Sequence, residues 1–205
     1  MRLFPAAKKS GHYLSLGAAW IASLALLLVW PLGADEAIAP GHRALRVVCD
    51  DNYPPYSFRG ESGAMQGIIP DHWQAWSKAT GVAVDFRGLS WSACQEAMAR
   101  GEADVIDSMF RTSERERVYD FLPPYAVLRV AVFYHRTISG IARPEDLRGF
   151  RVAAKSGDAC IKLLESHGVT DITEYPDYES IVAAAAREEL RIFCADEAPA
   201  LYFIY

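Results

Sequence analysis

The chain has 205 residues, with 21 Lys and Arg against 26 Asp and Glu, and its formal net charge at pH 7 is −5. Because acidic residues exceed basic ones and no stripe of Lys and Arg runs along the chain, a nucleic-acid-binding protein is excluded. Once the apolar N-terminal segment is set apart, the remainder is long enough for one large domain or two small lobes.

The N-terminal segment has the pattern of an export signal. Basic residues near the start precede an uncharged stretch at 13–34 that is rich in Leu, Ala and Trp. A basic head followed by an apolar run is typical of a secretion signal, although this run also approaches the roughly 20 residues that span a bilayer. We therefore expect residues 1–39 to be a cleaved signal peptide or a retained membrane anchor. Either one places the remainder in the periplasm, soluble or tethered to the inner membrane.

Strand and helix patterns alternate from Leu45 to Asp107. The predicted strands are 45–49, 82–86 and 103–107, and the predicted helices lie around 69–76, ended by Gly81, and from a capping box at 92–95 to Gly101. This order predicts right-handed crossovers and a parallel sheet covered by helices.

The alternation stops at a β-rich run, 125–134, which is suited to a connection between two bodies, and then restarts. Strands are predicted at 150–154, 172–175 and 190–194. One predicted helix follows 156–158 and runs through Ser166, and a second spans 180–187. We therefore predict an α/β fold with lobe 1 at 45–127 and lobe 2 at 128–205. Lobe 2 has fewer predicted strands and ends in an apolar run at 201–205, so we expect the C-terminal part of the fold to be missing.

The four cysteines favour disulfides in an oxidising compartment. Cys160 and Cys194 lie in the same half of the chain and are the first predicted pair. Cys49 and Cys94 are the second predicted pair, and four buried free thiols remain the alternative. Because no CxxC pair occurs, we expect no zinc site, and nothing in the sequence predicts a cofactor.

Five segments carry a resemblance to a known family, and they are Asp50–Phe58, Gly67–Asp71, Gly101–Ile106, Thr112–Arg115 and Asp120–Tyr125. They are similar in order and spacing to bacterial extracellular solute-binding proteins of family 3, and the resemblance covers residues 45–205. It implies the two-lobed periplasmic-binding-protein-like type 2 fold, with parallel-rich sheets and flanking helices, that closes on a small polar solute such as an amino acid.

A zwitterionic ligand needs a cation for its carboxylate and an anion for its amine. Arg115 follows a strand and a Thr-Ser turn, where its guanidinium can fork onto a carboxylate, and a helix near Thr112 would add free N–H groups. Asp196 follows a strand of lobe 2, at the edge where open α/β sheets bind ligands. The resemblance implies the same two roles. The alternative for Arg115 is a surface arginine. The alternative for Asp196 is an N-cap of the following segment, and Glu197 is a second candidate for the carboxylate that binds the amine.

Four further residues are expected at the ligand. The resemblance places Tyr53 and Trp91 on either side of the ligand's side chain, Asp50 near its side-chain group, and Ser108 at a strand end. The alternative for Tyr53 and Trp91 is that they are core aromatic residues, and the alternative for Asp50 is that it forms a turn. The sequence also departs from the family pattern, at positions Asp107, Phe110 and Ala159.

Two uses of solute binding remain open. The domain could deliver solute to the membrane subunits of an ABC-type transporter, or it could be the sensor ectodomain of a membrane histidine kinase or diguanylate cyclase, with its own signalling domain as partner. A dehydratase of the same fold is a third interpretation, with Asp107 or Glu197 as acid or base. We expect no enzyme, because no nucleophile–His–carboxylate set and no metal cluster is recognisable in the sequence.

Overall fold

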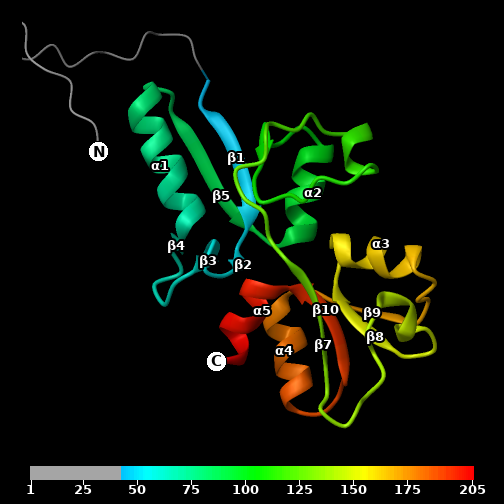
Figure 1. Ribbon diagram of the computed structural model, residues 1–205. Helices are drawn as coiled ribbons and strands as arrows, with labels where there is room; N and C mark the ends of the chain where they lie inside the picture. Colours follow the sequence, from blue (N-terminus) through cyan, green and yellow to red (C-terminus); the bar gives the residue numbers. More distant parts are fainter. Residues whose placement is uncertain (1–42) are drawn as a thin grey trace, which may run out of the picture. The chain divides into compact units, whose positions relative to one another are not determined.

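The computed structural model describes residues 43–205, which belong to one compact unit (Figure 1). The predicted signal or anchor, residues 1–39, lies outside the described residues. Within residues 43–205, no helix combines the length and the apolar character needed to cross a bilayer. Lobe 1 and lobe 2 are used below for the proposed ranges 45–127 and 128–205.

Lobe 1 contains a three-stranded sheet in the order β5-β1-β6, in which both strand pairs are parallel. The predicted alternation of strands and helices is therefore confirmed for this part of the chain. A small antiparallel sheet, β2-β3-β4, follows the end of β1. The elements are β1 (Leu45–Asp50), β2 (Asn52–Tyr53), β3 (Ser57–Arg59), β4 (Met65–Gln66), α1 (Ile68–Thr80), β5 (Val84–Leu89), α2 (Trp91–Ala99) and β6 (Val105–Ile106), followed by the 3-10 turn η1 (Arg115–Arg117).

The ends of the lobe 1 helices follow local chemistry. Helix α1 ends at Gly81, which adopts a left-handed conformation with φ 72° that glycine accepts without steric cost. Helix α2 is capped by Ser90, whose hydroxyl accepts a hydrogen bond from the Ala93 N–H at 3.4 Å. The predicted capping box at Ser92 is therefore wrong, because Trp91 already starts the helix and an N-cap residue must be extended.

Lobe 2 contains a four-stranded sheet in the order β7-β10-β8-β9. Strand β7 is antiparallel to β10, and the other pairs are parallel. The run 125–134 is thus a connection only in its first half, because its second half, β7, pairs along its whole length with β10. The elements are β7 (Val130–Tyr134), the 3-10 turn η2 (Pro144–Leu147), β8 (Val152–Lys155), α3 (Ala159–Ser166), β9 (Ile172–Tyr175), α4 (Tyr178–Ala186), β10 (Ile192–Asp196) and α5 (Glu197–Ile204).

Alternate residues of β8 and β10 point to opposite faces of the lobe 2 sheet. Ala153 and Phe193 pack in one core cluster against α4 and α5, whereas Val152 and Cys194 pack in the other, against α3. These helices flank the sheet in Figure 1. Tyr53, which comes from lobe 1, belongs to the first cluster, so the two lobes share apolar contact.

The predicted disulfide between Cys160 and Cys194 is confirmed, with 6.0 Å between the two Cα atoms. The predicted pairing of Cys49 with Cys94 is wrong, because both are buried free thiols. The Cys94 Sγ lies 3.7 Å from the Leu89 carbonyl oxygen, to which it donates. Burial raises the pKa of Cys94 to about 12, which keeps it a thiol and suppresses its reactivity.

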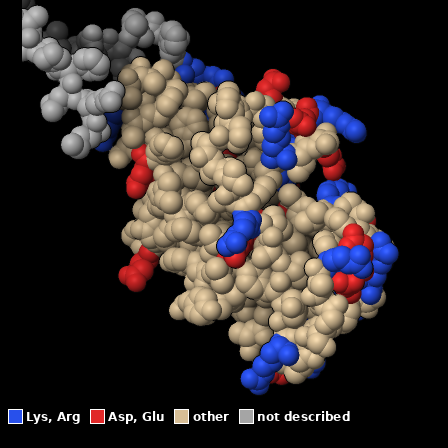
Figure 2. Space-filling model, viewed as in Figure 1, with Lys and Arg blue, Asp and Glu red and all other residues tan. Residues whose placement is uncertain are grey.

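Many of the exposed charges occur in neighbouring pairs of opposite sign. On the face in Figure 2, Lys and Arg side chains lie beside Asp and Glu side chains, with wide uncharged areas between the groups. The pairs Arg187–Glu189 at 2.7 Å and Arg100–Glu102 at 2.9 Å are of this kind. Pairs in such exposed positions contribute little to stability, so the charges that matter for function are the buried ones.

We predict that replacing both disulfide cysteines, as Cys160→Ala/Cys194→Ala, lowers the free energy of unfolding by about 2–4 kcal/mol. The reason is the loss of a cross-link that closes a loop with a sequence separation of 34. Chemical denaturation with and without reductant measures the effect. Reductant should destabilise the native protein and leave the double variant unchanged.

Alkylation of the denatured, unreduced protein provides the matching chemical measurement. We expect label on Cys49 and Cys94 alone. Label on Cys160, or protection of Cys49, would contradict the assigned pairing.

Candidate ligand-binding site

The six predicted site residues line one cavity between the lobes, with an empty volume of about 260 Å³ including its open mouth. This arrangement follows from the sheets, because β1, β8 and β10 all end at this cavity and parallel strands gather their carboxyl ends at one edge. The lining comprises Asp50, Tyr53, Trp91, Ser108, Phe110 and Arg115 from lobe 1 and Lys155, Asp158, Ala159 and Asp196 from lobe 2.

Arg115 presents a cation with no carboxylate partner among the residues that the structure describes. Its Nη1 donates to the Phe110 carbonyl oxygen at 3.0 Å, and its Nη2 donates across the lobes to the Gly157 carbonyl oxygen at 3.0 Å. Burial lowers the pKa of Arg115, and the nearby Asp158 and Asp196 oppose that effect. The guanidinium is therefore a partly desolvated charge whose two partners are neutral.

The predicted helix near Thr112 is wrong. Only the short turn η1 forms there, and it begins at Arg115. The Thr112 hydroxyl accepts a hydrogen bond from the Arg115 N–H at 3.3 Å, so that N–H is not directed at a ligand. Anion binding at this position therefore depends on the guanidinium and not on a helix N-terminus.

Asp196 is the last residue of β10, and the residue as a whole is 4% exposed. Its Oδ2 accepts a hydrogen bond from the Tyr53 hydroxyl at 2.7 Å, whereas Oδ1 is buried with no hydrogen-bond partner. Burial, followed by repulsion from Asp158, raises the pKa of Asp196 to about 6. A buried acceptor left unpaired costs free energy, so this oxygen is a strong candidate for a ligand donor.

The alternatives for this end of β10 do not fit the structure. Asp196 flanks the start of α5 but makes no side-chain capping bond to it. Glu197, the substitute, forms an ion pair with Arg129 at 2.6 Å and does not line the cavity. Asp196 therefore carries the carboxylate that faces the cavity here.

Trp91 and Tyr53 are both buried, and each makes a polar contact with lobe 2. The Trp91 indole N–H donates to the Gly157 carbonyl oxygen at 3.0 Å, and its ring centroid lies 5.4 Å from the Arg115 guanidinium carbon. Tyr53 packs in the core of lobe 2 while its hydroxyl donates to Asp196. Tyr53 therefore combines the two roles that the sequence left open, core residue and cavity lining.

Ser108 is presented by an unusual turn. Its φ is 60°, a left-handed conformation that is uncommon for a residue other than glycine. The Asp107 carboxylate accepts hydrogen bonds from the Ser108 N–H at 2.5 Å, from the Trp73 indole at 2.6 Å and from the Tyr125 hydroxyl. Asp107, which departs from the family pattern, thus holds this turn in place and does not line the cavity.

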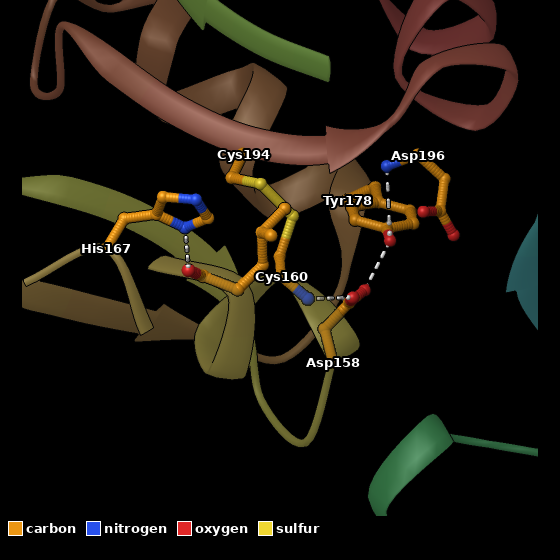
Figure 3. Close-up of a disulfide and its surroundings, with 7 residues drawn as sticks. Asp158, Cys160, His167, Tyr178, Cys194 and Asp196 are labelled. Atoms are coloured by element: carbon orange, nitrogen blue, oxygen red, sulfur yellow. Dashed lines mark hydrogen bonds between the residues drawn. A yellow bond between two sulfur atoms is a disulfide. The ribbon is translucent and has the colours of Figure 1, made fainter. Parts of the chain in front are cut away.

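Tyr178 links the carboxylate of Asp158 to the backbone of Asp196 (Figure 3). The Tyr178 hydroxyl donates to Asp158 Oδ2 and accepts from the Asp196 N–H at 3.4 Å. Asp158 also caps α3, accepting from the Cys160 N–H at 2.9 Å. The disulfide ties the first turn of α3 to β10, which carries Asp196, so it links the elements that position both acids.

Sequence reasoning missed three residues at this site: Lys155, Asp158 and Tyr178. Lys155 forms an ion pair with Asp50, with its Nζ 2.5 Å from Oδ2. Its position directly after a predicted strand was an available signal, since strand ends meet at the ligand edge. Asp158 had the signal of a helix N-cap, which indicates structure and not function. Tyr178 had no local signal, because its contacts depend on distant parts of the chain.

The model of the family described as "Bacterial extracellular solute-binding proteins, family 3" matches residues 45–191. The chain belongs to this family. L-cystine-binding protein TcyJ of Escherichia coli (strain K12) is 28% identical over 115 residues, which is 55% of this chain and 43% of TcyJ. The match thus spans less than half the length of that relative.

Solved structures show the same two-lobed fold. A histidine kinase sensor domain with similarity to periplasmic binding proteins superposes with a TM-score of 0.75 at 29% identity, covering 80% of this chain and 72% of that domain. An ancestral arginine-binding protein bound to glutamine superposes with a TM-score of 0.70 at 25% identity, covering 80% and 74%. The α/β fold with parallel-rich sheets predicted from the sequence is confirmed.

We predict that Asp196→Asn stabilises the ligand-free protein above pH 6. The pKa of this acid is raised from 3.8 to about 6, so between these values the folded state holds a proton that the unfolded state lacks. Asp196 thus favours folding least above pH 6, where it is ionised in a buried site. The neutral amide removes that penalty, which we expect to be about 1–3 kcal/mol.

Denaturation curves at pH 8 and pH 4.5 measure this effect, with Asp85→Asn on the exposed surface of β5 as the charge-matched control. The advantage of Asp196→Asn should shrink toward pH 4.5, whereas the control should show no such trend. A variant less stable than the native protein at pH 8 would contradict the assigned burial penalty.

Proposed function

We propose that this domain binds a small zwitterion of the amino-acid type between its lobes. Arg115 would fork onto the ligand carboxylate, and Asp196 would accept from the ligand ammonium. The observation that carries the proposal is the unpartnered Oδ1 of Asp196, in the same cavity as a guanidinium that has only neutral partners. A dipolar molecule supplies what each group lacks.

The contacts that join the lobes support binding by closure. The Gly157 carbonyl oxygen accepts from both Trp91 and Arg115, and Asn52 donates to Glu179 at 3.0 Å. These are polar contacts that a ligand can exchange for its own. Hinge closure in which each lobe supplies part of the contacts is an established way for two-lobed proteins to enclose a ligand. The small cavity favours a correspondingly small ligand.

We infer a binding role and not a catalytic one. The two acids that a dehydratase interpretation requires have other partners. Asp107 accepts three hydrogen bonds from its own lobe, and Glu197 pairs with Arg129. Neither lines the cavity. A general acid or base must reach the reacting group, and these two side chains do not point into the site.

Both uses of solute binding remain within the proposal. A relative from Haemophilus influenzae described as a probable amino-acid ABC transporter-binding protein, 26% identical over 112 residues, supports delivery to the membrane subunits of an ABC-type transporter. The histidine kinase sensor domain supports signalling through a fused domain. The fate of residues 1–39 separates them, because a retained anchor suits a sensor in the periplasm and a cleaved signal suits a soluble carrier. N-terminal sequencing of the exported protein is the direct measurement.

The binding site is tested by Arg115→Ala, with a ligand chosen by thermal-shift screening of amino acids and small organic acids. We expect affinity to fall by 2–5 kcal/mol, about 30-fold to several thousand-fold, because a buried charge on the ligand loses its partner. Isothermal titration calorimetry measures the loss.

Arg111→Ala is the matched control, since Arg111 lies four residues away, is exposed and pairs with Glu116 at 2.5 Å. Its affinity should equal that of the native protein. Unchanged affinity in Arg115→Ala would remove Arg115 from the site and overturn the proposal.

Affinity should also depend on pH through Asp196. Since its pKa is about 6 without ligand and the ammonium requires the ionised form, binding at lower pH must expel a proton. We expect affinity at pH 5 to be about tenfold weaker than at pH 7. Calorimetry at pH 5.5 in two buffers of different ionisation enthalpy counts the released proton. Binding without proton release at pH 5.5 would show that Asp196 is not the ammonium partner.

A further inference from the structure

A buried ion pair crosses between the lobes inside the cavity. Lys155, at the end of β8, places its Nζ 2.5 Å from Oδ2 of Asp50, at the end of β1, and both side chains are 4% exposed. Every other ion pair among residues 43–205 has both side chains at least 21% exposed. A pair so fully removed from water needs further contacts to offset the loss of hydration.

Aromatic rings supply those contacts to the ammonium. The Lys155 Nζ lies 4.3 Å from the ring centroid of Tyr178, 5.3 Å from that of Tyr53 and 5.6 Å from that of Trp91. Cation–π attraction is strongest where the cation is desolvated. One carboxylate and three rings thus form a complete cation site in the cavity, and the chain's own lysine occupies it.

The cavity groups that still lack partners match the head group of one amino acid, a carboxylate and an ammonium. Asp158 uses both carboxylate oxygens, for the Cys160 N–H and the Tyr178 hydroxyl, and Asp50 is bound to Lys155. Arg115 and Asp158 have only neutral partners, but Asp158 already uses both oxygens within lobe 2, whereas Asp196 Oδ1 has no hydrogen-bond donor. An α-amino acid's carboxylate and ammonium can use Arg115 and Asp196, which leaves no carboxylate oxygen of the cavity lining without a partner for a cationic ligand side chain.

From this balance we infer that Lys155 determines specificity and that the ligand is a zwitterion with an uncharged side chain. The inference rests on the proposed function. A cationic side chain would have to lie beside Lys155 and Arg115 while the carboxylate suited to it, Asp50, is already neutralised. Like charges brought together in a desolvated site disfavour binding strongly.

The first test compares ligands on the native protein by calorimetry, using L-glutamine and L-leucine against L-lysine and L-arginine. We expect the better of the uncharged pair to bind on the order of 100-fold more tightly than either cationic amino acid. Equal or tighter binding of L-lysine or L-arginine would overturn the inference. If no amino acid binds at all, the proposed function itself fails, so the two failures are distinguishable.

The second test removes the resident cation. Lys155→Ala leaves Asp50 and the three rings as an empty cation site, so L-lysine should bind at least about tenfold more tightly than it binds the native protein. Asp50→Asn/Lys155→Ala is the matched control and should lack this gain. If Lys155→Ala binds L-lysine no more tightly than the native protein does, Lys155 does not determine specificity. If that variant does not fold, Lys155→Met fills the space without a charge. It should still reduce the ratio between the affinity for uncharged amino acids and the affinity for L-lysine.

Discussion

The structure at this site depends on how charges are balanced after they have been removed from water. Five charged side chains line one small cavity. Each of them loses hydration on folding, so each needs a counter-charge or hydrogen bonds inside the protein. Asp50, Lys155 and Asp158 are balanced by the chain itself. Arg115 and Asp196 are balanced only in part, and burial together with repulsion from Asp158 raises the pKa of Asp196. A binding protein must keep such a deficit, because a fully satisfied site would have no free energy to gain from a ligand.

The fold creates this arrangement through strand direction and one cross-link. Parallel strands bring their carboxyl ends to the same edge, so Asp50, Lys155 and Asp196 reach the cavity as the last residues of β1, β8 and β10. The disulfide then joins the first turn of α3, next to Asp158, to β10, which ends at Asp196 (Figure 3). Two carboxylates that repel each other are held by a covalent bond that resists their separation. The stability of lobe 2 and the geometry of its acids therefore depend on the same contacts.

The sequence predicted what is local and missed what is distant. Strand ends at Asp50 and near Asp196 follow from apolar runs that stop at acidic residues, and the Cys160–Cys194 pair follows from two cysteines in one half of the chain. The partnership of Asp50 with Lys155 joins positions 105 residues apart, and no local pattern encodes it. The error at Thr112 has a different cause: the Thr and Ser that resemble a helix start instead form a tight turn that supports Arg115. The second cysteine pairing failed because equal numbers of cysteines per lobe say nothing about side-chain direction.

Closure and recognition share the same atoms, which limits how the site can be tuned. The Gly157 carbonyl oxygen holds Arg115 and Trp91 across the lobes, and the Tyr53 hydroxyl holds Asp196. A ligand that engages Arg115 competes with the contact to Gly157, so its net affinity is the difference between two similar hydrogen-bonded arrangements. The Asp50–Lys155 pair is different, because it joins the lobes without using either ligand-facing group. It can therefore favour the closed form while leaving Arg115 and Asp196 available. If Arg115 or Asp196 formed the ion pair that joins the lobes, that residue would no longer be free to bind the charged groups of a zwitterion.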